Sequence, residues 1–451
     1  MPGDFVYGIS TFERRRGDFP TLPVVNMIGE DIPVEPGVTL QSRPGLENTA
    51  ITMGAGPVRE LYQIDGILNN GLFGVSGNKL YNGSTEIGTI DGGGNVSMAG
   101  YEDFLFINAG TLIYKYDGTT LSTVPFPDDA DVSKICVLAS RLVALRKDTG
   151  TFYWSEPLDI TIPSLNFATA ENSPDKLLDI LPLADRLMLF GSETVEIWPA
   201  GTDQDLPFQP LPGATFPVGC RGVGTAAPFG RTYAWVTNYN EVCVGDPDNI
   251  ISDPELQIRI RQSSFVHIWP FFVDENEFLA VTLDNETWCY GLRNQLWSTF
   301  KSYGEDNWVC QCYENNYFGT TLNGTLVQWS ETDYSDFGGV MQREFSGWIT
   351  LTGEPLWIAN IVLRTNPGTT PYLEGEFMEP VVQLRTSLDG GRTWQPWQSQ
   401  PLGVQGQYRA KTIWSSMGQF GYPGVLVQVR NSDPVPFRIS GLTYNEPFGG
   451  I

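Results

Sequence analysis

The chain has little positive charge and no long apolar run. Its 451 residues include 27 lysines and arginines against 52 aspartates and glutamates, a formal net charge of −25. Affinity for nucleic acid requires basic groups that neutralise phosphates, so this balance excludes a protein that holds nucleic acid by charge. Attraction to an anionic membrane surface is unsupported for the same reason.

Segments that would direct the chain into or across a membrane are also missing from the sequence. No apolar run approaches the roughly 20 residues of a membrane helix. The opening stretch MPGDFVYGISTFERRRGDF lacks the apolar core of a signal peptide. We therefore expect no membrane insertion, and a protein that stays where it is made or leaves by cell lysis.

Histidine and paired cysteines are scarce. The single histidine, His267, lies in the apolar stretch FVHIWPFF and is interpreted as a core or interface residue. One histidine excludes a multi-histidine metal site and leaves little room for a histidine-dependent triad. The six cysteines form no CxxC pair, which indicates reduced core thiols. Cys310 and Cys312 are two apart in a strand pattern and are expected to share one face, where a metal site stays open as an alternative.

Other sequence motifs for chemistry are missing too. There is no phosphate-binding GxxxxGK[ST] loop and no dinucleotide fingerprint. We predict no catalytic residues, no cofactor and no metal site, and leave open calcium at turn aspartates such as Asp117, Asp246 and Asp284.

Glycine, proline and aromatic residues are abundant, and a hairpin pattern repeats. With 49 glycines, 32 prolines and 12% aromatic residues, the composition favours an all-β chain. A short apolar strand, a polar turn and an aromatic-rich strand recur seven times, about 41 residues apart, which is the length of one propeller blade. The copies are LFGVSGNKLYNG, FLFINAGTLIYKYDG, LVALRKDTGTFYWSE, LMLFGSETVEIWPAG, YAWVTNYNEVCVGD, FLAVTLDNETWCYG and YFGTTLNGTLVQWSE.

This rhythm predicts a β-propeller over residues 51–340, with seven blades, or six if one hairpin belongs elsewhere. A long β-sandwich or a β-solenoid is the alternative. The aromatic residues on the second hairpin strands are interpreted as packing between blades rather than stacking on sugars. They are Tyr114, Tyr153, Trp154, Trp198, Trp288, Tyr290 and Trp329.

The two ends of the chain differ from the middle. Six prolines break residues 1–50, which we expect to form an extended arm that packs on other domains or subunits. Its basic spot, Arg14, Arg15 and Arg16, is either a solvated segment or a contact to an acidic partner or DNA phosphate. Residues 341–451 show about six alternating strands without the 41-residue rhythm, which is typical of a β-sandwich or jelly roll.

One motif within this last region, SLDGGRTW, fits the Asp-box pattern found in sialidases and other sugar-cleaving propellers. Its residues are Ser387, Asp389, Gly391, Thr393 and Trp394. We interpret the motif as a structural turn, in which the aspartate and the glycine backbone close a hairpin and the tryptophan lies beneath it. Sialidases carry several copies within their blades, together with an arginine triad and a Tyr/Glu nucleophile pair, and no segment visibly assembles these.

Several segments taken in order resemble the tail hub proteins of short-tailed bacteriophages. These proteins are also called packaged-DNA stabilisation proteins, tail accessory factors or tail nozzles. The resemblance covers nearly the whole chain, and its most specific parts are Asn26–Met27, Arg43–Leu46 and the C-terminal YRAK…W…GQF block. The segments are LPVVNMIGE, LQSRPGL, GLFGVSGNKLYNG, GTIDGGGNVSMAG, TSLDGGRTW, QYRAKTIWSSMGQF and VLVQVRNSDPVPFRISGLTYNE.

The resemblance implies a propeller plus a sandwich, assembled as a homo-hexameric ring below the portal and the head-to-tail adaptor. Such a ring retains packaged double-stranded DNA, forms its exit channel, and carries tail fibres or spikes and a plug or needle. It implies a non-enzymatic protein of the virion tail, assembled in the host bacterial cytoplasm, which reduced cysteines suit. An acidic lumen would let DNA slide without sequence-specific binding.

Ring contacts are expected at the N-terminal arm and in the C-terminal domain. The candidate interface residues are Arg14, Arg15, Arg16, Arg43, Pro44, Gly45, Leu46 and Arg409. Two other functions stay open. One is a glycan-active propeller, either a depolymerase or a lectin. The other is a bacterial propeller scaffold unrelated to phage.

Overall fold

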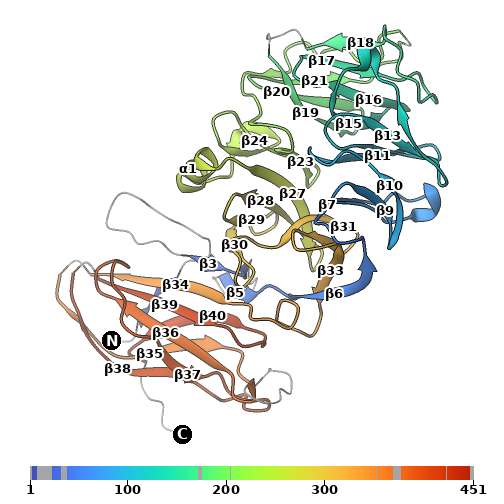
Figure 1. The fold of residues 1–451 in the computed structure, drawn as a ribbon. Coiled ribbons are helices and arrows are strands. Elements are labelled where there is room, and N and C mark those ends of the chain that lie inside the picture. The colour runs from blue at the N-terminus through green and yellow to red at the C-terminus, as the bar shows by residue number, and fades with distance from the viewer. Residues whose placement is uncertain are drawn as a thin grey trace.

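The protein consists of a ring of β-sheets and a β-sandwich, joined by strands from the start of the chain (Figure 1). The computed structural model describes residues 3–7, 23–31, 38–170, 175–203, 205–351, 353–368, 377–422 and 424–446. Nearly all regular structure in these residues is strand. The exceptions are the helix α1 (Pro254–Gln262), capped by Asp253, and two short 3-10 turns, Leu68–Asn70 and Pro127–Asp129.

Across the described ranges, seven four-stranded antiparallel units form the blades of a propeller. The strands are given from the innermost to the outermost. Blade 1 has β7 (Val58–Tyr62), β8 (Phe73–Ser76), β9 (Lys79–Asn82) and β10 (Thr85–Thr89); blade 2 has β11 (Ser97–Tyr101), β12 (Phe104–Asn108), β13 (Ile113–Tyr116) and β14 (Leu121–Val124); blade 3 has β15 (Val132–Leu138), β16 (Arg141–Arg146), β17 (Thr151–Trp154) and β18 (Phe167–Thr169). Blade 4 has β19 (Leu177–Leu183), β20 (Arg186–Gly191), β21 (Val195–Pro199) and β22 (Thr215–Phe216); blade 5 has β23 (Ala226–Phe229), β24 (Thr232–Val236), β25 (Val242–Val244) and β26 (Asp246–Ile250); blade 6 has β27 (Val266–Val273), β28 (Asn276–Leu283), β29 (Thr287–Gly291) and β30 (Trp297–Phe300); blade 7 has β31 (Cys310–Glu314), β32 (Tyr317–Thr320), β33 (Thr325–Ser330) and β6 (Gly45–Thr52).

The blades are held together by apolar clusters, each shared by two successive blades. Seven such clusters run around the ring, and the one formed by Val58, Leu61, Cys312 and their neighbours joins blade 7 back to blade 1. Because each sheet is covered on both faces, central strands such as β24 and β28 are buried along nearly their whole length. This explains why the sequence shows near-continuous apolar runs there rather than alternation.

The predicted all-β class, a propeller plus a C-terminal sandwich, is confirmed, and the described residues form seven blades rather than six. The aromatic residues of the second hairpin strands lie in or against the clusters between blades, as expected.

The ring closes with a strand from the start of the chain. Strand β6 pairs antiparallel with β33, with Leu46 opposite Trp329, and so completes blade 7. The boundary expected at residue 50 therefore falls inside a strand of the propeller. The division into residues 1–50, 51–340 and 341–451 stays a prediction.

The sandwich has two sheets around a separate core that includes Phe5, Val24, Phe345, Trp414 and Val427. Strands of the start of the chain belong to both sheets. The first sheet has the order β4 (Met27–Asp31), β5 (Val38–Ser42), β40 (Arg438–Tyr444), β35 (Leu356–Thr365) and β38 (Thr412–Phe420), with β1 (Gly3–Asp4) beside β40. The second has the order β3 (Val24–Val25), β34 (Arg343–Thr350), β39 (Gly424–Asn431), β36 (Val381–Ser387) and β37 (Gln398–Pro401), with β2 (Val6–Tyr7) beside β34.

One strand connects the two bodies through backbone hydrogen bonds. β3 pairs antiparallel with β34 of the sandwich and parallel with β30 of blade 6, where Val25 lies opposite Thr299. The sheet of blade 6 and one sheet of the sandwich are thus a single ten-stranded sheet.

The two neighbouring cysteines correct one expectation. Cys310 packs in the cluster between blades 6 and 7, whereas Cys312 packs in the cluster between blades 7 and 1. They do not share a face, because the register of β31 shifts between them at a β-bulge. Burial raises the pKa of both thiols well above the ordinary value, and the six cysteines are free and buried.

Candidate functional site

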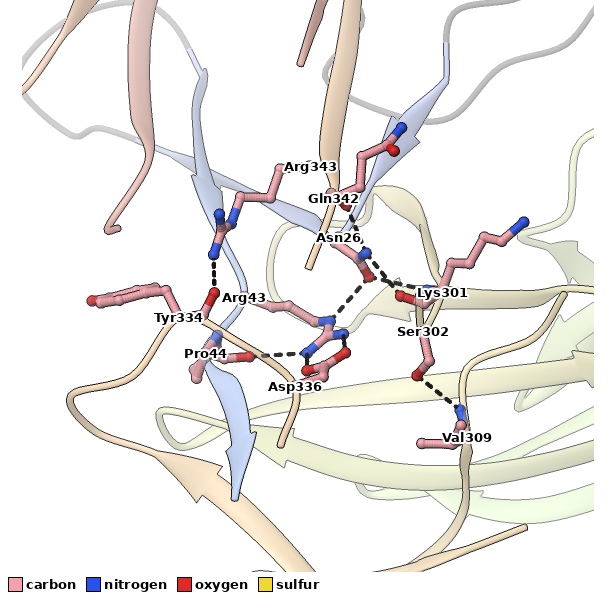
Figure 2. A network of polar contacts seen from close by, with 10 residues as sticks. All are labelled: Asn26, Arg43, Pro44, Lys301, Ser302, Val309, Tyr334, Asp336, Gln342 and Arg343. Carbon is pink, nitrogen blue, oxygen red and sulfur yellow. Dashed lines mark hydrogen bonds and ion pairs between the residues drawn. The ribbon is translucent and has the colours of Figure 1, made fainter. Parts of the chain in front are cut away.

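A buried ion pair lies where the propeller meets the sandwich. Arg43, between β5 and β6, donates two hydrogen bonds to the carboxylate of Asp336, at 2.9 and 2.6 Å, and a third to the carbonyl of Pro44 (Figure 2). The Arg43 side chain has no exposed surface and that of Asp336 is 4% exposed. Because a buried guanidinium is tolerated only with a full set of partners, this geometry fixes the crossing of the chain from one body to the other.

Asn26 completes the set of partners. Its side-chain oxygen accepts from Arg43 Nε and from the backbone of Lys301, both at 3.0 Å. Its amide donates to the carbonyls of Lys301 and Gln342 at 2.9 and 2.8 Å. One side chain between β3 and β4 thereby ties the loop after blade 6 to the segment that opens the sandwich (Figure 2). Asn26 has φ of 53°, a backbone region that asparagine tolerates better than most residues.

Aromatic rings and a second buried arginine surround this pair. The Arg43 guanidinium lies 5.5, 5.8 and 6.0 Å from the ring centroids of Phe300, Trp308 and Trp329. Arg343 donates to Asn431 and to the carbonyls of Asp433 and Tyr334. Burial, reinforced by the charge of Arg43, lowers the pKa of Arg343 to about 9. We name the set Asn26, Arg43, Asp336 and Arg343 the junction cluster.

The predicted interface residues divide between this junction and the outer surface. Residues 43–46 run into the junction, where the Arg43 side chain contacts its own chain and has no surface left for a second subunit. Gly45 and Leu46 are buried as well. Arg409 is exposed on the sandwich, and its role as a ring contact stays a prediction. Arg14, Arg15 and Arg16 lie outside the described residues.

The Asp-box residues form a closed turn between β36 and β37. Asp389 accepts from the backbone and hydroxyl of Thr393, at 2.8 and 2.7 Å, and from the hydroxyl of Ser387 at 2.8 Å. Gly391 donates its backbone N–H to the Ser387 oxygen. Bonds to Thr393, before those to Ser387, hold the pKa of Asp389 at about 2. Trp394 stacks against Arg385. The carboxylate is thus engaged in the turn rather than presented to a substrate.

A cavity of about 930 Å³ lies on the propeller axis, between the innermost strands. On its wall, Lys134 forms an ion pair with the buried Asp179. Burial raises the pKa values of Glu60 and Glu314 to about 7. Burial also lowers the pKa of His267 to about 4, and its Nδ1 lies 3.1 Å from the carbonyl of Gly224. The His267 side chain is half-buried in the wall of this cavity, and its interpretation as a core or interface residue stays a prediction.

The described ranges hold no group of three or more histidine, cysteine, aspartate or glutamate side chains that could bind a metal ion. No described helix is long and apolar enough to cross a membrane. The junction cluster was partly missed by sequence reasoning. Asp336 is 293 positions from Arg43, and nothing local marks it. Asn26 and Arg43 were noticed, but only as parts of a resemblance.

Residues 5–326 match the family model described as "Bacteriophage P22 Gp10, beta-propeller". The Tail hub protein gp10 of Salmonella phage P22 is 28% identical over 184 residues, which is 38% of this chain. The matched part spans 39% of that relative's length.

Three solved structures illustrate how distant the structural similarities are. The β-propeller domain of Myceliophteria thermophila Cps50 (Swd1) is 11% identical, with a TM-score of 0.42 over 63% of this chain and 100% of its own. BamB from Moraxella catarrhalis is 11% identical, with a TM-score of 0.35, and 69% and 98% of the two chains are covered. PorZ of Porphyromonas gingivalis is 14% identical, with a TM-score of 0.37 over 78% of this chain and 46% of its own. At these scores the propeller assignment rests on the sheets themselves.

Proposed function

This chain belongs to the family of the bacteriophage P22 Gp10 β-propeller proteins, and from that membership we propose that it is a structural protein of a phage virion tail. The observation that carries the proposal is the family match over residues 5–326. This range begins in the N-terminal strands of the sandwich, includes Asn26 and Arg43 of the junction cluster, and ends in strand β33 of the closing blade. The relative from phage P22 bears the name tail hub protein, and we propose the same role here.

The finer proposal is a homo-hexameric hub, or nozzle, below the portal and the head-to-tail adaptor. A subunit of such a ring must carry load between neighbours without changing shape. Support comes from the junction, where a shared ten-stranded sheet and a buried ion pair lock the two bodies of the subunit. Interfaces with fibres or spikes and with a plug or needle belong to the same proposal.

The proposed DNA channel lies between subunits and not inside one propeller. The axial cavity has the volume of a small-molecule pocket, and polar and apolar side chains line it. The net charge of −25 on each subunit supports a channel that repels phosphates. DNA would then be retained by a closed tail rather than by affinity, and would slide out when the tail opens.

We propose a non-enzymatic role. The engaged Asp389 carboxylate and the burial of the blade aromatics between blades support this proposal over a glycan-active propeller.

Electron microscopy of tails from particles that carry this chain tests the proposal. The expected result is a six-fold ring of this protein directly below the portal and adaptor. A matched preparation lacking the chain should lose that ring and release its packaged DNA. The protein occurring as single copies outside every particle, with turnover of capsular polysaccharides or sialosides, would overturn the hub and favour the glycan alternative.

A further inference from the structure

Two arginines of the sandwich stack on tryptophans on the outer face of β36 and β39, Arg385 against two rings and Arg430 against one. The Arg385 guanidinium carbon lies 4.3 Å from the ring centroid of Trp394 and 4.4 Å from that of Trp397. The guanidinium carbon of Arg430 lies 4.0 Å from the Trp397 centroid. We call these four residues the cation–aromatic ladder. The Asp-box turn places Trp394, so the motif contributes to a surface feature as well as to a hairpin.

Hydrogen bonds fix the plane of each guanidinium. Arg385 donates from Nε to the side-chain oxygen of Gln428 at 2.5 Å, and Arg430 donates from Nε to that of Gln383 at 2.7 Å. No acceptor among the described residues takes a hydrogen bond from the terminal Nη atoms of either arginine. Both arginines are partly exposed. The sheet therefore presents two oriented forks of N–H donors, the geometry that binds a carboxylate with two parallel hydrogen bonds.

The ladder is only partly neutralised within its own chain. Glu344 of β34 lies near both arginines, and Gln428 donates to it, but it forms no ion pair with either of them in the described structure. Stacking on tryptophan also lowers the entropy lost when a ligand binds, because the guanidinium is already held. The ladder is thus prepared for an external anionic group.

The distribution of charge along the chain identifies the partner. Residues 45–340, which contain the strands of the propeller, have 15 basic and 38 acidic residues, a net charge of −23. Residues 1–44 and 341–451, which contain the strands of the sandwich, have 12 basic and 14 acidic residues, a net charge of only −2. A second copy of the chain therefore presents an acidic propeller to a nearly neutral sandwich, and two copies attract best when sandwich meets propeller.

We propose that the cation–aromatic ladder binds carboxylate side chains on the propeller of a second copy of this chain. The inference rests on the proposed ring and names one of its contacts. Such a contact joins different surfaces of the two subunits, which is the type of interface that closes into rings. DNA phosphate is the weaker candidate, because the rest of the chain repels it.

A competition assay tests the ladder. Tails are assembled from an equal mixture of isotope-labelled wild-type chain and an unlabelled variant, and mass spectrometry of purified tails measures the ratio. Arg385→Gln with Arg430→Gln should be under-represented by roughly tenfold, since oriented charge pairs at interfaces are costly to break. Lys411→Gln, which removes one exposed charge of the same sandwich, should enter tails equally. Melting curves check that each variant is folded.

A second experiment identifies the partner residue. Arg385→Lys with Arg430→Lys keeps the charge but lacks the fork, and should be under-represented less strongly than the glutamine pair. Carbodiimide treatment should then couple the introduced amines to aspartates or glutamates within residues 1–340 of a differently labelled copy. Coupling only within one copy, or only to another virion protein, would overturn the inference.

The outcomes separate this inference from the proposed function. If the wild-type chain enters tails as a ring and the glutamine pair competes equally, the ladder is not a ring contact while the hub stands. If the wild-type chain enters no tail, the hub itself fails. Loss of binding to a short DNA duplex by the glutamine pair, with equal entry into tails, would assign the ladder to phosphate instead.

Discussion

Replacing Asp336 by asparagine tests whether the junction cluster holds the two bodies of the subunit together. Asparagine has nearly the same shape, so no cavity forms, but the buried Arg43 guanidinium loses its counter-charge. Two charge-assisted hydrogen bonds, at 2.9 and 2.6 Å, are weakened or lost. Each contributes about 1.5–3 kcal/mol. The summed contribution of the two hydrogen bonds agrees with the roughly 3–5 kcal/mol that removing one partner of a buried ion pair costs. We therefore expect Asp336→Asn to destabilise the protein by about that amount.

Urea unfolding followed by tryptophan fluorescence measures the effect. Trp308 and Trp329, two of the 13 tryptophans, are stacked at 5.8 Å beside Arg43 and contribute the part of the signal that comes from the junction. An exposed pair provides the control. Asp148, 72% exposed and 3.2 Å from Lys176, should cost less than about 1 kcal/mol when replaced by asparagine.

The double change Arg43→Met with Asp336→Leu separates two effects: the loss of the ion pair itself, and the cost of leaving the Arg43 guanidinium buried without a counter-charge. Since apolar replacements of buried pairs are often neutral, it should recover most of the stability lost in Asp336→Asn. If Asp336→Asn costs no more than the surface control, the junction does not depend on this pair and the reasoning fails.

Three further changes test other parts of the structure. Gly45→Ala should destabilise the protein by roughly 1–3 kcal/mol in urea unfolding, because a Cβ there would overlap backbone oxygens of the segment after blade 7, whereas Gly93→Ala, with nothing within 4 Å, should be neutral. Glu60→Gln should stabilise the protein at pH 8 by no more than about 3 kcal/mol and hardly at all at pH 4. The folded pKa of about 7 is raised, so the carboxyl lowers stability as pH rises from about 4.5 to 7; equal melting shifts at both pH values would contradict this. Asp389→Ala should lower the melting temperature of the sandwich at neutral pH and much less at pH 1. The folded pKa of about 2 is depressed, so the stabilisation exists above about pH 4 and is lost as pH falls through 2. A difference that is as large at pH 1 as at neutral pH would show that the ionised carboxylate is not what closes the turn.

The periodic part of the fold was open to prediction from the sequence alone. Each blade contains a local hairpin whose two strands and turn lie within about 15 residues, so the pattern repeats visibly along the chain. The spacing between successive hairpins matched the length of one blade. The aromatic residues of the second hairpin strands are frequent because these strands pack between blades. The Asp-box turn is equally local, since every hydrogen bond of Asp389 is made within four residues.

Pairings between distant segments were not predictable in the same way. β6 looks like any polar strand near the start of the chain, and nothing in it marks β33 as its partner. Cys310 and Cys312 were expected on one face because side chains alternate between the two faces of a regular strand, and the bulge between them breaks this alternation. The ladder depends on side chains of β36, β39 and the turn between β36 and β37, which meet only after the sheet has formed.

The closing strand of the propeller also constrains the order in which the chain can fold. β6 must wait for β33, about 280 residues later. At 5–20 residues per second of synthesis this delay is roughly 14–56 s. Strands β1 and β2 wait longer still, for β40 and β34 of the sandwich, and β5, which can pair early with β4, waits for β40 at its other edge. During that time the first strands to leave the ribosome have unpaired edges, which are prone to aggregation. A chain that terminates before residue 325 would keep β6 without its partner, so fragments of this protein should be insoluble even when most blades are complete.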